Sequence, residues 1–233
     1  MKIAIIPARG GSKRIPRKNI KEFRGKPIIA YSIEAALESA CFDHVVVSTD
    51  DEEIAEVARR YGAELPFMRP SELSGDHTPT IPVIRHAIRW AESEAELPDA
   101  VCCIYATAPF VTADDLKNGL RILQEKPDTD FAFSATRFDF PIQRAIGLND
   151  DGTTRMFQPD HELTRSQDLP AAYHDAGQFY WGTREAWLTQ EGVFSACSRI
   201  ILLPKDRVQD IDTPEDWERA SILFQMIARK DLQ

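Results

Sequence analysis

The sequence is poor in cysteine and glycine and has no long apolar run. The 233 residues include four cysteines and 11 glycines. The cysteines lack metal-site spacing, and Cys102 and Cys103 lie within an apolar stretch, so we expect reduced thiols in the core. No apolar run approaches the roughly 20 residues of a membrane span. The run after Lys2 is too short for a secretory signal. These absences predict a cytoplasmic protein with no membrane partner.

Basic residues are a minority in this chain, but they are concentrated. Lysine and arginine number 28 against 37 acidic residues, a net charge of −9. Nine of the basic residues lie within positions 1–26, which hold one acidic residue, so the remainder has a net charge of −17. Nonspecific duplex binding needs a broad basic face, so we expect no nucleic-acid partner. A cation cluster in an acidic chain predicts a site for a small anion.

The cations surround a glycine loop that follows the first apolar run. After residues 3–6 come Gly10, Gly11 and Ser12, flanked by Arg9 and Lys13. Glycines let the backbone approach an anion, and cationic side chains suit a polyphosphate. The alternative is a flexible surface loop with solvated charges. The Walker spacing and the dinucleotide fingerprint are both absent, so the loop must follow another phosphate-binding design.

Strands and helices alternate along the first 137 residues. Parallel strand–helix–strand units with this rhythm indicate the α/β class, with a sheet covered on both faces. We expect Asp50 to cap the helix that Gly62 closes. The expected strands are 2–6, 44–50, 63–67, 99–105 and 131–137, and the expected helices are 27–40, 51–62, 80–95 and 113–126.

The alternation stops at Phe138. Residues 138–176 are irregular and polar, and such a long loop is either functional or an extension. We interpret it as a β-rich excursion inserted into an α/β domain of residues 1–137 and 177–233, and we expect it to pair with a second subunit. Strands are expected at 177–183 and 198–204, followed by a helix that starts at Thr213 and Pro214.

A second motif, "DIDTPED", lies near the C-terminus. If Asp210 and Asp212 end a strand, they face the same side and repel each other unless a cation lies between them. Mg²⁺ prefers a few carboxylates together with waters and substrate phosphates. The alternative is that Thr213, Glu215 and Asp216 begin a helix while the two aspartates are solvated. Together with the anion loop, the motif predicts phosphoryl or nucleotidyl transfer.

The segment "IPARGGSKRIPRKN" resembles the signature of the CMP-sugar-acid synthetases, the sialic acid cytidylyltransferase family. "GKPIIAYSIEAAL", "RPSELSGDHT" and "QDIDTPEDWERA" follow in family order. The resemblance implies a Rossmann-like three-layer α/β sandwich with a mostly parallel sheet, of the nucleotide-diphospho-sugar transferase type. It also implies a protruding dimerisation element, hence a homodimer. The family reaction joins CTP to a nonulosonic acid, giving the CMP-sugar and pyrophosphate with Mg²⁺.

Within the family, the chain resembles the pseudaminic acid branch. Arg14 replaces a usual glycine, "YATAPF" replaces "QPTSPL", and "TRSQDLPAAYHDAGQFYW" is closer to that branch. The expected product is CMP-pseudaminic acid, a precursor for surface glycan biosynthesis. The alternatives are transfer to N-acetylneuraminic, legionaminic or deoxyoctulosonic acid, or a non-catalytic nucleotide-binding module.

The resemblance also implies roles for single residues. Arg9 and Lys18 would stabilise charge on the phosphates, while Asp210 and Asp212 would hold Mg²⁺. The nucleophile would be the sugar's anomeric hydroxyl. The sequence identifies no general base, for which a metal-bound hydroxide and Asp210 are candidates. Alternatively, Arg69 forms a loop-ordering ion pair and 178–181 is a plain core strand. Nucleotide-binding residues would be Ala8, Arg9, Gly10, Ser12, Lys13, Asn19, Arg69 and Thr78. Sugar-binding residues would be Tyr105, Gln178, Tyr180 and, from the partner subunit, Arg165.

Overall fold

The computed structural model describes residues 1–95 and 97–230 and is built around a six-stranded sheet. The strand order is β10-β6-β9-β5-β1-β4, and β9 runs antiparallel to its neighbours β5 and β6 while the other pairs are parallel. This confirms the predicted α/β class with a mostly parallel sheet. The strands are β1 (Lys2–Pro7), β4 (His44–Ser48), β5 (Ala100–Ile104), β6 (Phe131–Arg137), β9 (Tyr173–Thr183) and β10 (Ser198–Leu202).

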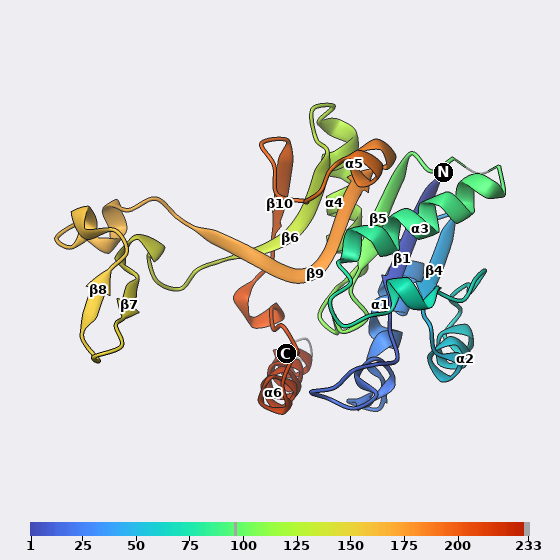
Figure 1. The fold of residues 1–233 in the computed structure, drawn as a ribbon, viewed down its shortest axis with the longest axis horizontal. Coiled ribbons are helices and arrows are strands. Elements are labelled where there is room, and N and C mark those ends of the chain that lie inside the picture. Colours follow the sequence, from blue (N-terminus) through green and yellow to red (C-terminus); the bar gives the residue numbers. More distant parts are fainter. Residues whose placement is uncertain (96, 231–233) are drawn as a thin grey trace.

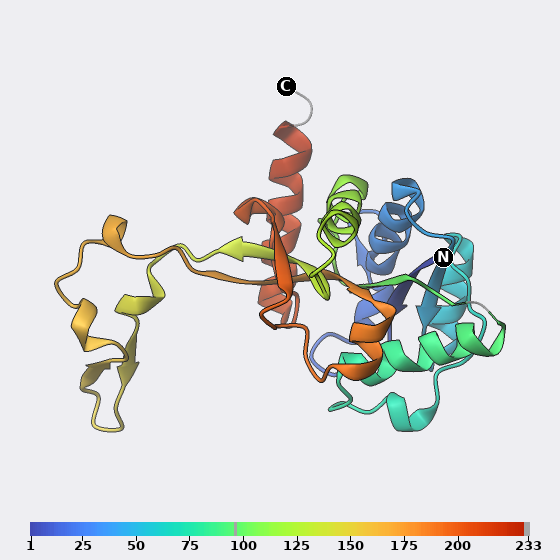
Figure 2. The same ribbon diagram turned by 90° about the horizontal axis from the view of Figure 1, so that it is seen from above.

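Helices cover both faces of the sheet, as Figure 2 shows from above. One face carries α1 (Ile28–Ser39), α2 (Glu52–Arg60) and α4 (Ala113–Glu125), and the other carries α3 (Thr80–Ser93) and α5 (Arg184–Thr189). Consecutive residues of β5 point to opposite faces, so Cys102 packs in the first layer and Cys103 in the second. Both are fully buried free thiols, as the apolar run around them predicted.

The start of α2 differs from the prediction by one residue. Asp51, rather than Asp50, caps the helix, because its carboxylate accepts the N–H groups of Glu53 and Ile54, both at 3.0 Å. Asp50 instead accepts the N–H of Gly10 at 3.0 Å. Gly62 follows the helix with a φ of 92°, a conformation that favours glycine, as expected.

The strand expected at 63–67 is reduced to one parallel bridge between Val46 and Glu64. Glu64 donates its N–H to Val45 at 2.8 Å and accepts that of Val47 at 2.9 Å. The next residue in the same register is Pro66, which has no N–H to donate, so the ladder stops.

The segment after Phe138 leaves the body of the protein (Figure 1). β9 starts at Tyr173, and its first residues pair with the end of β6, so the expected boundary at 176/177 falls inside a strand. The excursion holds the antiparallel pair β7 (Ile146–Leu148) and β8 (Thr154–Met156) and three 3₁₀ turns. The expectation of a β-rich excursion is therefore wrong, because turns and loops outnumber strand residues there.

The C-terminal helix packs against the N-terminal segment. α6 (Pro214–Lys230) begins with the predicted cap: Thr213 Oγ1 accepts the N–H of Asp216 at 3.2 Å, and the Asp216 carboxylate accepts that of Thr213 at 2.9 Å. Between 1–95 and 97–230, no helix combines the length and apolarity needed to cross a membrane. A third apolar cluster joins α6 to the short strand β2 (Glu22–Phe23), which pairs with β3 (Lys26–Pro27). The cluster consists of Ile15, Phe23, Ile28, Phe110, Ile211 and Ala220.

Candidate active site

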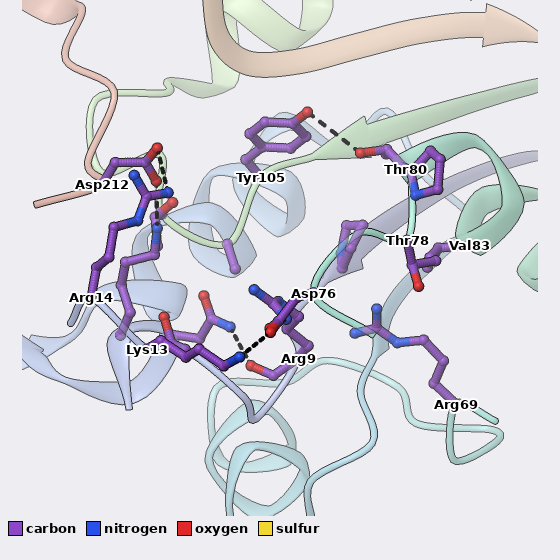
Figure 3. Close-up of a pocket in the computed structure, with 17 residues that line it drawn as sticks. Arg9, Lys13, Arg14, Arg69, Asp76, Thr78, Thr80, Val83, Tyr105 and Asp212 are labelled. Atoms are coloured by element: carbon purple, nitrogen blue, oxygen red, sulfur yellow. Dashed lines mark hydrogen bonds and ion pairs between the residues drawn. The ribbon is translucent and has the colours of Figure 1, made fainter. Parts of the chain in front are cut away.

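A cavity of about 480 Å³ lies at the carboxyl ends of β1 and β5. The strand order changes direction here, because the chain continues from β1 to β4 on one side and later returns to β5 on the other. In open α/β sheets, ligands bind in the crevice at such a switch point. The lining residues include Arg9, Ser12, Lys13, Arg14, Lys18, Asn19, Arg69, Asp76, Thr78, Thr80, Tyr105 and Asp212 (Figure 3).

The loop after β1 is fixed against the start of α2. A Cβ atom on Gly10 would lie 2.6 Å from Asp51 Oδ2, so only glycine permits this close approach. Arg17 has a φ of 56°, and its guanidinium donates to the two Asp51 oxygens at 2.5 and 2.9 Å. Hydrogen bonding to Arg17 is the main cause that lowers the pKa of Asp51. The loop therefore starts and ends on one helix N-terminus.

Three of the expected nucleotide ligands are engaged within the protein. The N–H of Ala8 donates to Ser48 O at 2.9 Å, and that of Gly10 donates to Asp50. The Asn19 amide donates to Arg9 O at 2.9 Å, so Asn19 supports the loop backbone while it lines the cavity. The loop residues Arg9, Ser12 and Lys13 line the cavity as well.

The two ends of the chain meet at this cavity. Lys18 Nζ donates to Ile211 O at 2.7 Å and lies 3.3 Å from Asp212 Oδ1. Arg14 Nη2 lies 2.8 Å from Asp212 Oδ2. Ile211 is fully buried in the third apolar cluster, which holds its neighbours Asp210 and Asp212 in place. The basic loop and the acidic motif therefore surround one space.

Asp210 and Asp212 lie in an extended loop, and the condition that they end a strand is not met. Asp212 lines the main cavity, whereas Asp210 lines an adjoining cavity of about 550 Å³ that also contacts Tyr105. Burial, followed by the negative charge of Asp212, raises the pKa of Asp210. The two acids therefore stand at the boundary between two cavities.

The donor chemistry of this acid pair fits Mg²⁺. Asp210 and Asp212 supply hard carboxylate oxygens, and the negative charge of Asp212 disfavours ionisation of Asp210 unless a cation intervenes. In the described part of the chain, no group of three or more His, Cys, Asp or Glu side chains forms a metal cage. Mg²⁺ is commonly held by one or two carboxylates with waters and substrate phosphates, which matches this donor set.

The loop between α2 and α3 closes another side of the cavity. Arg69 is 6% exposed and donates to Ser48 O at 2.8 Å, and burial lowers its pKa. Thr78 lines the cavity on the same side. The sequence analysis missed Asp76, which pairs with both Arg9 and Lys13. The sequence marks Asp76 only as an acidic residue in a polar loop, two residues before Thr78.

Two of the four expected sugar-binding residues line a cavity at the site, and the other two lie elsewhere. The rings of Tyr105 and Tyr180 contact each other in a tilted arrangement, with 5.4 Å between their centroids. Both residues line the adjoining cavity, where Tyr180 Oη donates to Asp175 at 2.5 Å. Gln178 is buried, and its amide donates to Arg207 O at 2.5 Å, away from the cavity walls. Arg165 lies on the excursion, where it pairs with Asp168 at 2.8 Å. The single chain thus brings Tyr105 and Tyr180, but not Gln178 or Arg165, to the site.

A family model described as cytidylyltransferase matches residues 3–226. The chain belongs to the cytidylyltransferase family. It is 51% identical to a pseudaminic acid cytidylyltransferase from Campylobacter jejuni, over 96% of each chain. It is 30% identical to an N-acylneuraminate cytidylyltransferase from Escherichia coli, over 99% of this chain and 54% of that protein.

A solved structure has the same fold. It is a CMP:2-keto-3-deoxy-manno-octonic acid synthetase complexed with CTP, with a TM-score of 0.70 and 18% identity over 97% of this chain and 98% of that one. These findings confirm the family resemblance and the nucleotidyltransferase fold that were inferred from the motifs.

Replacing Asp51 by Asn is expected to destabilise the protein at neutral pH and less so in acid. The folded pKa of Asp51 is lowered by Arg17, so its contribution is full above the unfolded value of about 4 and disappears as pH falls through the lower folded value. Both side chains are partly exposed, and we expect a loss of about 1 kcal/mol at pH 7. Urea unfolding at pH 7 and about pH 3 measures the difference. Asp150→Asn, at an exposed position, is the control. A loss of unfolding free energy by Asp51→Asn that is larger at about pH 3 than at pH 7 would contradict the role given to the Arg17–Asp51 pair.

Proposed function

We propose that this chain is a cytoplasmic enzyme that transfers CMP from CTP to the anomeric hydroxyl of pseudaminic acid, releasing pyrophosphate with Mg²⁺ present. Family membership and the 51% identity to a protein named for this activity support the proposal. Cys41, Cys102, Cys103 and Cys197 carry free thiols, which accords with a reducing compartment.

The observation that carries the proposal is the contact between Lys18 and the acidic motif. It joins residues 193 positions apart and brings the basic loop and Asp212 to one cavity of about 480 Å³, with Asp210 on the adjoining cavity. Ligand pockets of roughly 300–1,000 Å³ accommodate molecules of nucleotide size. Cations for the phosphates on one side and carboxylates for a divalent cation on the other are what nucleotidyl transfer requires.

In the proposed reaction the side chains position charge, and the substrates supply the reacting atoms. Arg9, Lys13 and Lys18 would bind the triphosphate and stabilise the charge that develops on the leaving pyrophosphate. Asp210 and Asp212 would hold Mg²⁺, which when bound polarises the α-phosphate. Asp210 faces the adjoining cavity, so its carboxylate is placed to accept the proton of the attacking hydroxyl.

The sugar acid would occupy the cavity next to the nucleotide. Tyr105 lines both cavities, so it separates the two binding regions and presents an amphipathic ring to each. Tyr180, Asp175 and His174 complete the polar wall of the second cavity. Attack from this side places the anomeric hydroxyl beside Asp210.

The active form is proposed to be a homodimer joined through the excursion. Large apolar side chains are exposed on this segment, among them Leu163 at 93%, Phe140 at 82% and Leu148 at 76%. An apolar group of this kind on a protruding element is typical of an association surface. Arg165 lies on the same element, so a two-fold dimer would deliver it to the partner's sugar cavity.

A substrate panel tests the proposed function. Pyrophosphate release is measured with CTP and each of pseudaminic, N-acetylneuraminic, legionaminic and deoxyoctulosonic acid. We expect kcat/KM for pseudaminic acid to exceed the others by about 100-fold or more, because hydrogen-bonded sugar pockets reject analogues strongly. Activity on N-acetylneuraminate alone would replace the substrate assignment. CTP binding without turnover of any sugar would favour the non-catalytic alternative.

Replacing Asp212 by Ala should abolish turnover with little effect on the fold. The change removes a proposed metal ligand and the partner of Lys18 and Arg14, and we expect kcat to fall by about 100-fold or more. Pyrophosphate release at saturating CTP and pseudaminic acid gives kcat, and circular dichroism monitors folding. Glu215→Ala, an exposed acid in the first turn of α6, is the matched control. Chelation of divalent cations should have the same effect, and unchanged turnover would contradict the metal assignment.

Mixing two inactive variants tests whether Arg165 acts across subunits. Arg165→Ala and Asp212→Ala should each be inactive alone. If Arg165 serves the partner's site, subunit exchange creates mixed dimers with one intact site, and pyrophosphate release returns. Sedimentation analysis should show a species of twice the 26.3 kDa chain mass. A monomer, or mixtures that stay inactive after exchange, would contradict the shared site.

A further inference from the structure

We propose that Asp76 is a carboxylate placeholder for the terminal phosphates of the nucleotide, and that its competition with them limits how tightly the site holds pyrophosphate. The inference rests on the proposed cytidylyl transfer and assigns this loop residue a role in nucleotide affinity and product release.

Asp76 bridges two cations of the anion loop. Arg9 Nη1 donates to Asp76 Oδ1 at 2.5 Å, and Lys13 Nζ pairs with Asp76 Oδ2. One anionic group thus uses both oxygens on two different cations, which is how two non-bridging phosphate oxygens would engage them. Figure 3 shows the carboxylate directed at both side chains from the opposite wall of the cavity.

A polyphosphate and the Asp76 carboxylate would compete for these partners. The contacts with Lys13 and then Arg9 lower the pKa of Asp76 to about 2, so the carboxylate stays charged at neutral pH. A phosphate within hydrogen-bond distance of Arg9 and Lys13 would also contact Asp76, and like charges at that separation repel. Binding therefore exchanges one anion for another on the same two cations.

The loop that carries Asp76 lies between two fixed points. At one end Arg69 donates its N–H to Thr49 O at 2.7 Å, and at the other end α3 begins at Thr80. Thr78 and Thr80 line the main cavity, and Thr80 Oγ1 lies 3.5 Å from Tyr105 Oη. A shift of Asp76 on exchange would therefore be confined to the residues between these points, which include Thr78 in the cavity wall.

The exchange has a consequence at the end of the reaction. Pyrophosphate then lies on the loop cations, and the return of Asp76 to Arg9 and Lys13 opposes it. A neutral side chain at position 76 could not compete in this way. Loss of the carboxylate should thus strengthen binding of pyrophosphate and of CTP while slowing product release.

Calorimetric titration of the full chain with inorganic pyrophosphate and with CTP tests the inference. We expect Asp76→Asn to bind pyrophosphate about three- to tenfold more tightly than the unmodified protein, in line with the modest strength of partly exposed ion pairs. Both KM for CTP and kcat should fall, and inhibition by added pyrophosphate should strengthen. Asp76→Glu keeps a competing carboxylate and should remain close to the unmodified protein.

The controls separate charge from position. Asp128→Asn removes one negative charge at the opposite edge of the sheet, where Asp128 pairs with Arg199, and should leave pyrophosphate affinity unchanged. Asp76→Ser is a second neutral variant that should match Asp76→Asn. Equal or weaker pyrophosphate binding by the neutral variants would overturn the inference and make Asp76 a residue that orients the cations. Failure of the unmodified protein to bind CTP or pyrophosphate would overturn the proposed function as well.

Discussion

The site depends on one contact between the ends of the chain, the Lys18 ammonium on Ile211 O and Asp212. Partly exposed ion pairs contribute only about 0–1 kcal/mol each, so this contact does not hold the ends together by itself. The apolar cluster around Ile15, Phe23 and Ile211 does, since each buried large side chain contributes about 1.5–3 kcal/mol. Apolar packing therefore sets the position of the charges, and the charges then determine what the cavity binds.

Strand direction explains why catalysis and association would share one edge of the molecule. β1, β5 and β6 are parallel to one another, so their carboxyl ends lie at the same edge. The loop after β1 forms the anion site there, and β6 leaves the body at that edge to form the excursion. β9 returns antiparallel between β5 and β6 and brings Tyr180 back beside Tyr105. A segment that projects from this edge begins next to the sugar region.

The sequence predicts best where a local pattern is unambiguous. The strand at 131–137 has the expected bounds because apolar residues fill four of its first five positions, and Gly62 ends its helix because only glycine favours that φ. Adjacent aspartates at 50 and 51 are chemically equivalent caps, and the contact that separates them comes from Gly10, which is distant in sequence. Similarly, pairing with β6 makes Tyr173 the start of a strand although the polar residues His174 and Asp175 follow it.

The site residues show the same difference between local patterns, which the sequence reveals, and contacts between distant residues, which it does not. Arg9, Lys13 and Lys18 belong to one short motif, so the sequence alone brings them together. Gln178 and Asp76 depend on partners far along the chain. Gln178 turns to the carbonyl of Arg207, a residue that Asp115 fixes in a bidentate ion pair, and it is drawn away from the cavity. The alternation of residues along a strand predicts the sheet face from which a side chain projects. It does not predict which hydrogen-bond acceptor a long side chain will reach.

Charge pairing within the cavity reconciles a basic loop with an acidic protein. Arg9 and Lys13 are paired with Asp76, while Arg14 and Lys18 are paired with Asp212. A simple anion meets neutralised partners and gains little by displacing a carboxylate. Under the proposed function, magnesium and a triphosphate arrive with complementary charges, so the phosphates can take the cations while Mg²⁺ takes the released Asp212. The exchange gives the four cations and Asp212 new partners and leaves Asp76 to compete, which favours the combined ligand over either ion alone.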